Sequence, residues 1–487
     1  MKTRNALILF LLGTLAVRLW LVWASEPSVQ EAYYFLCGER PEAAYFDGPS
    51  GTARMVSLAS SVLGDNWRLI APLWSLAASL VCLWLATAMI GPQSALLAII
   101  WLNLVPAFNI VSLRVGPELP MLTLCTLGIA CFWKALRLAG WIWWVAAAGA
   151  FATAALFSYW SILLAAILTL FAISESRRHE RASPWAGLVI IWLAIALIWV
   201  PALIWNSWHA WIPMFPVTLK SLLSPKWVAG SSELLALLLA ISPFVAYGAI
   251  RAWFASAGQI AQSQMSRLAF ISALPFLFLA LFSIYHGSPA SAFFLLTLPV
   301  LLPGLAALWR RSQMLTAVTA LVAAGLTWPL AHQALSTSDG FEDVAEHIRQ
   351  LEEGLRADVP GGLFLIAGDD GLASAVSYHL RHDIIPPDGH PRVYVRESQA
   401  GQSQFAFWPS YEAFVSAEKA PNQYFEEQKA VNPFIGRYAL YVGREQPGKL
   451  PQAISGAFSE VQFVRKMLPG KDPLYIYLCL EYQTLPL

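Results

Sequence analysis

The 487-residue chain is 57% hydrophobic and only 13% charged, whereas soluble domains carry about 25% charged residues. Its 31 Lys and Arg nearly balance its 30 Asp and Glu, so no strongly basic surface is expected and nucleic acid is excluded as a partner. The five cysteines show no C-x-x-C pair or zinc spacing, which argues against a metal–thiolate site. Composition therefore predicts a protein that lies mostly within a membrane.

Apolar stretches of span length recur through the first two thirds of the chain. Residues 5–24 have the roughly 20 apolar residues that a span requires and no small-residue cleavage site, so they indicate a retained anchor. Further candidates run at 68–90, 94–113, 119–137, 141–157, 159–174, 186–205, 233–252, 268–285, 291–309 and 314–333. These stretches predict a polytopic helical membrane protein with about 11 transmembrane helices. Cys125 and Cys131 lie within one of them and are expected to be buried.

The Lys and Arg residues predict the orientation. If the N-terminus is cytoplasmic, nearly every inner loop is basic, including the loop with Arg177, Arg178 and Arg181, and the pair Arg310 and Arg311. An odd number of spans then places the C-terminus outside the membrane. A long first loop, 25–66, and a second polar segment, 206–232, fall on the same outer side.

The composition changes after about residue 335. An amphipathic helix is predicted near the start of this region, followed by five short apolar or alternating runs typical of strands. The letters "GDDG" after the first run indicate a strand-to-helix turn, because they lack the glycine spacing of a phosphate-binding loop. The sequence thus predicts a membrane domain over 1–334 and an extracytoplasmic α/β domain over 335–487.

Two polar stretches stand out on the predicted outer side. Residues 28–51, "SVQEAYYFLCGERPEAAYFDGPSG", are dense in carboxylates and tyrosines, and carboxylates buried next to a membrane are costly unless they are used. Residues 205–227 interleave Trp, His and Lys with apolar residues. This second stretch is either an interfacial aromatic belt or a lid over a lipid-substrate groove.

Several short motifs resemble the membrane glycosyltransferases of family 39, which include dolichyl-phosphate-mannose protein mannosyltransferases and aminoarabinose–lipid A transferases. "VQEAYYFLCG" is similar to the family's Asp-Glu-x-Tyr-Tyr motif, and "YFDGPSG" to its Tyr-Phe-Asp-His-Pro-Pro. "RVGPELPML" resembles Thr-Pro-Asp-x-Pro-Leu, and "PALIWNSWHAW" resembles a Pro-x-x-x-Trp-Asn-x-x-His-x-Trp stretch. "IAGDDGLASAVSYHL" is similar to a strand and helix of the family's outer domain.

The resemblance implies a GT-C fold and an inverting transferase. Such an enzyme moves a sugar from a polyprenyl-phosphate donor to an acceptor glycan, lipid or protein on the outer face of the cytoplasmic membrane. Inverting displacement needs a base for the acceptor's proton and a cation for the leaving phosphate. Carboxylates in such a site either act as bases or bind a divalent cation, and the sequence leaves both open.

Two chemically decisive positions depart from the family. Gln30 replaces the expected base, and an amide cannot accept that proton; Gly48 replaces a basic residue. The acids that remain as catalytic candidates are Glu31, Asp47 and Glu118, although Glu31 and Glu118 also suit helix capping.

The substrate-binding candidates are the aromatic, amide and basic side chains of the outer stretches: Gln30, Tyr33, Tyr34, Arg114, His209, Lys220 and His286. Arg18 is expected to snorkel toward the interface near its helix end. A catalytically degenerate homologue that binds lipid or a partner is the alternative function. A transporter is disfavoured, because no pair of Gly/Pro-broken helices is evident.

Overall fold

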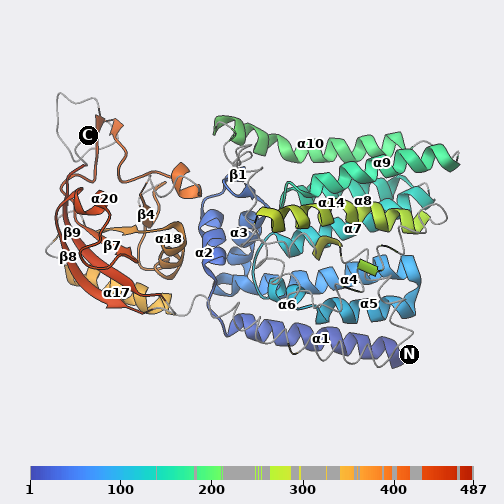
Figure 1. The fold of residues 1–487 in the computed structure, drawn as a ribbon, viewed down its shortest axis with the longest axis horizontal. Coiled ribbons are helices and arrows are strands. Elements are labelled where there is room, and N and C mark those ends of the chain that lie inside the picture. The colour runs from blue at the N-terminus through green and yellow to red at the C-terminus, as the bar shows by residue number, and fades with distance from the viewer. Residues whose placement is uncertain are drawn as a thin grey trace. The chain divides into compact units, whose positions relative to one another are not determined.

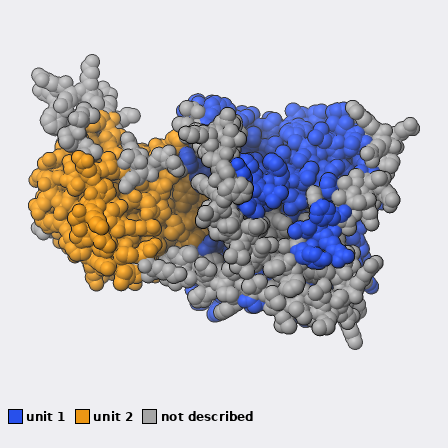
Figure 2. All heavy atoms as spheres, in the orientation of Figure 1, with its two compact units in different colours: residues 1–25, 41–334 blue, residues 26–40, 335–487 orange. Residues whose placement is uncertain are grey.

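The computed structural model describes residues 2–209 except 139 and 180–183, residues 264–286, and residues 340–484 with short gaps at 356–358, 360–361, 387–388, 397–402, 417–429 and 469–471. Between 210 and 339 it otherwise describes only scattered positions. The chain forms two compact units, which are described separately (Figure 2). Unit 1 comprises residues 1–25 and 41–334, and unit 2 comprises residues 26–40 and 335–487.

Unit 1 is a bundle of apolar helices (Figure 1). The described helices are α1 (Lys2–Trp23), α3 (Gly51–Leu63), α4 (Ile70–Ile90), α5 (Pro92–Leu104), α6 (Pro106–Ser112), α7 (Glu118–Leu138), α8 (Trp141–Ala155), α9 (Ser161–His179), α10 (Trp185–Trp208) and α14 (Gln264–His286). A 3₁₀ turn, Gly64–Leu69, joins α3 to α4. Pro106 cannot continue the hydrogen bonding of the helix before it, and α5 and α6 meet at a bend of 68°.

Five stretches in the described part of the chain are long and apolar enough to cross a membrane, and the bent α5–α6 pair would make a sixth. These stretches are Asn5–Trp23, Gly51–Ile90, Glu118–Leu138, Trp185–Trp208 and Arg267–Tyr285. The spans predicted at 233–252, 291–309 and 314–333 lie outside the described residues or have only scattered positions in them. The several apolar helices are therefore confirmed, and the total of about 11 stays a prediction.

Close helix packing holds unit 1 together. In α7, a Cβ at Gly128 would collide with the ring of Phe151 in α8, so glycine lets these helices approach. Cys125 and Cys131 are buried in the same core, as predicted. Between α9 and α14, Arg267 forms a buried two-pronged ion pair with Glu175, with N–O distances of 2.7 and 2.9 Å.

Unit 2 combines helix α2 (Val29–Glu39) with a mixed sheet and its helices. The five-stranded sheet has the order β4-β3-β7-β9-β8. Its strands are β3 (Phe364–Ala367), β4 (Val393–Val395), β7 (Ala439–Gly443), β8 (Phe458–Met467) and β9 (Leu474–Tyr482). β3 pairs in parallel with β4 and β7, whereas β9 is antiparallel to both β7 and β8. All five predicted runs form strands.

Helices and short elements complete unit 2. α17 (Phe341–Leu355) is the predicted amphipathic helix and buries Val344 and Ile348. α18 (Asp370–His379) begins at the predicted turn, where Asp369 Oδ1 accepts a hydrogen bond from the Leu372 amide at 2.8 Å. The shorter elements are the 3₁₀ turn η3 (Gln404–Phe407), the pair β5 (Val415–Ser416) and β6 (Ala430–Val431), and α20 (Gln452–Ser455).

Candidate functional site

The first candidate acid, Glu31, caps a helix. The α2 helix begins after Ser28, whose hydroxyl accepts a hydrogen bond from the Glu31 amide at 3.3 Å. The Glu31 carboxylate in turn accepts from the Ser28 amide at 2.8 Å and from its hydroxyl at 2.9 Å. This reciprocal pair is a capping box, and Glu31 is only 1% exposed. The structure therefore places Glu31 in the capping role that the sequence left open.

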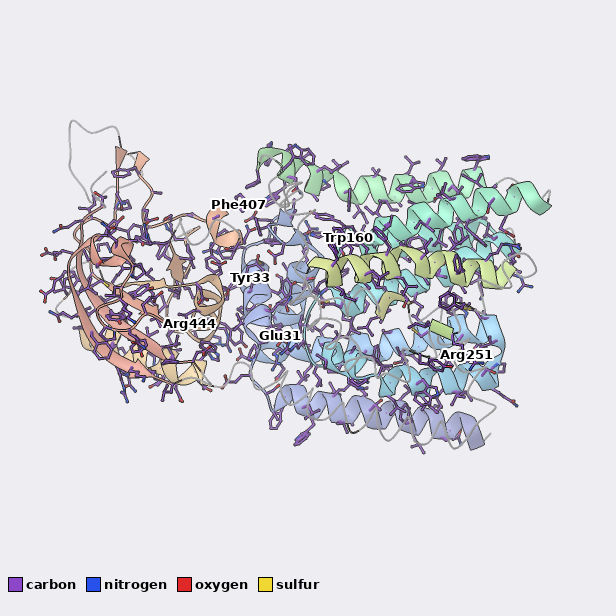
Figure 3. All side chains as sticks on the ribbon, viewed as in Figure 1. Glu31, Tyr33, Trp160, Arg251, Phe407 and Arg444 are labelled. Carbon is purple, nitrogen blue, oxygen red and sulfur yellow. The ribbon has the colours of Figure 1, made fainter. Side chains whose placement is uncertain are left out.

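The other candidates on α2 are Gln30, Tyr33 and Tyr34, and Figure 3 labels Tyr33 together with Glu31. Gln30 is exposed, and its amide nitrogen lies 3.4 Å from the Tyr34 hydroxyl. The Tyr33 and Tyr34 rings are half-buried, with centroids 5.7 Å apart. The helix packs within unit 2 against α18, where Phe35 meets Tyr378 edge to face at 5.1 Å. The sequence assigned this segment to the outer loop of the membrane domain, whereas its packing groups it with residues 335–487.

The second candidate acid, Asp47, lies at the tip of a hairpin in unit 1. β1 (Ala44–Tyr45) and β2 (Gly48–Pro49) pair antiparallel, with Tyr45 opposite Gly48, so Phe46 and Asp47 form the two-residue loop. The Asp47 side chain is exposed. Gly48 has a φ of +156°, a backbone conformation that side-chain-bearing residues rarely adopt. The glycine that replaces the family's basic residue at position 48 therefore suits the local backbone.

A polar chain joins this hairpin to the end of α10. The Glu42 amide donates to the Tyr45 hydroxyl at 3.0 Å, and the Glu42 carboxylate accepts from the Trp205 indole nitrogen at 2.6 Å. The His209 ring stacks on Trp205 at 3.9 Å, and its Nδ1 lies 2.8 Å from the Trp205 carbonyl oxygen. The sequence singled out His209 but missed Glu42. Its position five residues before Asp47, within the same acidic stretch, was the available signal.

The same end of α10 buries an amide. Asn206 is 1% exposed, and its side-chain nitrogen donates to the Ala202 carbonyl at 2.8 Å and lies 3.4 Å from the Tyr159 hydroxyl. Its side-chain oxygen has no hydrogen-bond partner within the described part of the chain. A buried acceptor of this kind is costly unless something donates to it. Of the Trp-Asn-x-x-His motif, Trp205 thus contacts the hairpin segment through Glu42, whereas Asn206 bonds within α10 and to Tyr159.

The third candidate acid, Glu118, begins α7. Its carboxylate folds back so closely over Gly116 that a Cβ there would collide with it. The half-buried Arg114, which lies between α6 and α7, interacts with it electrostatically. The two residues therefore form a local pair of opposite charge at the start of a span.

Arg18 does not snorkel, so that expectation was wrong. The residue is 4% exposed and donates to Asn109 Oδ1 at 2.7 and 3.3 Å and to Ser75 Oγ at 3.1 Å. Its guanidinium also lies 5.2 Å from the centre of the Phe108 ring. Tertiary packing brings α4 and α6 to α1 and supplies these neutral partners. No carboxylate in the described ranges forms an ion pair with Arg18.

The structure does not describe the side chains of the two remaining candidates. Lys220 lies outside the described residues, as does most of the stretch 205–227. His286 ends α14, and its side chain is not described. Within the described residues, no group of three or more His, Cys, Asp or Glu side chains is arranged to hold a metal ion.

Comparisons with known proteins agree with the architecture. Residues 51–205 match the family model of the dolichyl-phosphate-mannose-protein mannosyltransferases. The structure of ArnT from Cupriavidus metallidurans bound to undecaprenyl phosphate is similar over 97% of both chains, with a TM-score of 0.63 and 13% identity. The chain has the GT-C fold. This agreement confirms the resemblance to family 39 glycosyltransferases that the sequence motifs indicated.

Two further structures share the fold more distantly. The oligosaccharyltransferase AglB from Archaeoglobus fulgidus, in complex with an inhibitory peptide and a dolichol-phosphate, is similar over 89% of this chain and 69% of its own, with a TM-score of 0.52 and 12% identity. The arabinofuranosyltransferase AftD from Mycobacteria covers 97% of this chain and 42% of its own, with a TM-score of 0.50 and 16% identity. No curated protein matches the sequence.

Proposed function

We propose that this GT-C membrane protein is an inverting glycosyltransferase. It moves a sugar from a polyprenyl-phosphate donor to an acceptor glycan, lipid or protein on the outer face of the cytoplasmic membrane. The observation that carries the proposal is the similarity over nearly the whole chain to an ArnT structure that holds undecaprenyl phosphate. The dolichol-phosphate in the AglB complex supports the same class of lipid.

Arg18 supports a phosphate-bearing donor. A cation buried among neutral groups in a span attracts an anion, and no carboxylate in the described part of the chain forms an ion pair with Arg18. Its partners Asn109 and Ser75 orient the guanidinium without neutralising it. We assign Arg18 to the lipid phosphate, where it would stabilise the charge of the leaving group. Arg114 is a weaker candidate for the lipid phosphate, because Glu118 interacts with it electrostatically.

Asp47 is the best-placed base among the three candidate acids. It is exposed at a hairpin tip, so an acceptor hydroxyl can approach it, whereas Glu31 is buried in the α2 cap. In the inverting step, the acceptor oxygen attacks the anomeric carbon from the side opposite the lipid phosphate. Asp47 takes the acceptor's proton as the bond to phosphate breaks.

The second candidate function is a degenerate homologue that binds lipid without transferring sugar. Gln30 favours it, because an amide stands where the family's base is expected and cannot take a proton. The capping role of Glu31 also favours this alternative, because the carboxylate next to Gln30 already accepts hydrogen bonds from Ser28.

Turnover of a radiolabelled polyprenyl-phosphate sugar by the purified protein separates the two functions. The transferase releases labelled sugar, and Gln30→Asp changes its rate only modestly. If the protein is a degenerate homologue, the wild type transfers no sugar but still binds the lipid. Only in that case can Gln30→Asp create activity.

The orientation is tested by labelling with an impermeant thiol reagent. The five native cysteines are buried, so they contribute little background. Cysteines introduced at Ser176 in α9 and at the exposed Ser459 in β8 should label from opposite sides of the membrane. Labelling of both from one side would rule out an outer C-terminal domain.

A further inference from the structure

The last strand of the unit 2 sheet leaves its outer edge open. β8 ends the strand order β4-β3-β7-β9-β8, and Figure 1 shows it at the margin of the sheet. The strand is 10 residues long, whereas strands of about 5–6 residues are the most common. Most of its side chains are exposed, among them Phe463 at 48% and Val464 at 36%. A long exposed edge of this kind is a template for pairing with another strand.

Three polar side chains of β8 share one face of the sheet, because their β9 partners alternate along that strand. The three pairs are Glu460 with Leu480, Gln462 with Leu478, and Arg465 with Ile476. The Gln462 side-chain nitrogen donates to Glu460 Oε1 at 2.9 Å, in agreement with a shared face. The register shifts between Phe463 and Arg465, so Val464 is the extra residue of a β-bulge. Without that extra residue, Arg465 would lie on the face opposite to Glu460.

The order of these side chains makes β8 complementary to itself. When two β8 strands are aligned antiparallel and centred on Gln462, Glu460 of each copy lies opposite Arg465 of the other. All of these side chains are exposed and can reach a second chain. Opposite charges that face each other across two antiparallel strands are favourable, and like charges are unfavourable.

The other face of β8 fits the same alignment. Val461 of one copy lies opposite Phe463 of the other, which is an apolar pair. Lysine on an edge strand often serves to prevent pairing, but Lys466 falls opposite the uncharged Ser459 in this register. The alignment therefore places no two like charges opposite each other.

We propose that unit 2 binds a second copy of the same chain through β8, as an antiparallel strand pair with a two-fold axis at Gln462. Main-chain hydrogen bonds between the two edges join the sheets of the two copies. Two ion pairs between Glu460 and Arg465 flank the axis and fix the register. The occupant is a second copy, because a two-fold interface must be complementary to itself, and this strand meets that condition.

The inference goes beyond the proposed transfer reaction and does not depend on it. Asp47 and Arg18, on which the proposed chemistry rests, lie in unit 1. Association through β8 is measured without a lipid donor and without turnover. A failure of this proposal and a failure of the proposed function therefore give different results.

Disulfide cross-linking of the full chain in membranes tests the pairing and its register. Gln462→Cys places a thiol on the two-fold axis beside its own copy, so mild oxidation should give a disulfide-linked dimer. Ser459→Cys is the matched control, because this position is also exposed on β8. In the proposed register it lies about 20 Å from its own copy, too far for a disulfide. It should therefore give no more dimer than the unsubstituted chain, whose described cysteines are all buried.

Charge reversal tests the complementarity. Glu460→Arg places like charges opposite each other in both ion pairs, and so does Arg465→Glu. Each single variant should lower the association constant of the chain in detergent by about tenfold, as measured by analytical ultracentrifugation. The two substitutions together restore opposite charges with their signs exchanged, so the double variant should associate like the wild type. Thermal unfolding checks that each variant folds, which is expected for exposed positions.

Four results would overturn the proposal. They are the absence of a dimer from Gln462→Cys, an equal yield of dimer from Ser459→Cys, unchanged association in both single charge variants, and a double variant that associates no better than the single ones. A cross-link from Gln462→Cys to a different protein would also overturn it, and would show that the edge serves another partner.

Discussion

The two units handle charge in opposite ways. Unit 1 exposes large apolar side chains, such as Leu9 at 70% and Leu197 at 73%, and keeps Arg18 and Arg267 buried. Unit 2 does the reverse: its edge strand β8 exposes most of its residues, while its core is rich in buried tyrosine and phenylalanine. A charged side chain in a lipid-facing bundle is costly unless another group bonds to it, so each buried charge of unit 1 points to a specific interaction partner. Charged side chains of unit 2 can be solvated by water, so their positions say less about such partners.

The largest expected effect comes from breaking the buried pair of unit 1. Arg267→Leu leaves Glu175 buried without its counter-charge, and such losses cost about 3–5 kcal/mol. The free energy of unfolding in detergent measures this. The double variant Arg267→Leu with Glu175→Leu should recover much of the loss. A single variant within 1 kcal/mol of wild type would mean that the pair is not desolvated.

The next effect separates the hairpin of unit 1 from the cap of unit 2. Asp47→Asn should lower sugar transfer by about 10²-fold or more, the scale for removal of a general base, with no change in expression. Glu31→Gln should leave transfer nearly intact, because glutamine can also complete a capping box. The initial rate of transfer from a labelled donor measures both. The opposite ranking of the two variants would move the base to α2.

Arg18→Gln should weaken the lipid donor's interaction by about tenfold or more, because hydrogen bonds to charged groups contribute roughly 1.5–3 kcal/mol. The dependence of the transfer rate on donor concentration reports it. Thermal unfolding serves as the control, since Asn109 and Ser75 can also bond to glutamine. If the variant is less stable but its transfer rate depends on donor concentration as in the wild type, the role of Arg18 is structural.

A smaller effect is expected when the α2 cap is removed. Glu31→Ala should lower the stability of unit 2 by about 1 kcal/mol, the usual cost of a lost cap. The unfolding midpoint of the full chain is the measurement, and Glu31→Gln is the matched control. No difference between the two substitutions would indicate that the capping box contributes little.

A separate expected effect is a pH dependence of unit 2. Burial, and then Arg381, lower the pKa of His379 to about 4. Between the ordinary value near 6.5 and 4, the unfolded chain binds a proton that the folded chain does not. Unfolding free energy should therefore fall as pH drops through this window and level off below it. His379→Gln should flatten part of that slope in unfolding midpoints measured from pH 7 to pH 4; an unchanged slope would exclude this residue as its source.

Much of the fold was predictable from local patterns. Long apolar stretches predicted the described spans, a short apolar run predicted β3, and alternating or β-branched and aromatic runs predicted β4, β7, β8 and β9. These features depend on residues close together in the sequence, so hydrophobic length and periodicity suffice to find them. The turn at Asp369 was equally local, because a cap needs only a residue three positions away.

The roles of the polar residues depended on distant partners. Arg18 was expected at the interface until packing placed it beside Asn109, 91 residues away, and Trp205 meets Glu42 across 163 residues. In unit 2, Arg40 likewise donates a hydrogen bond to the carbonyl oxygen of His390, 350 residues along the chain. Sequence alone determined which side chains can carry charge or donate hydrogen bonds. Only the tertiary structure decided which of them are buried together, because burial and partner geometry arise when separate elements pack.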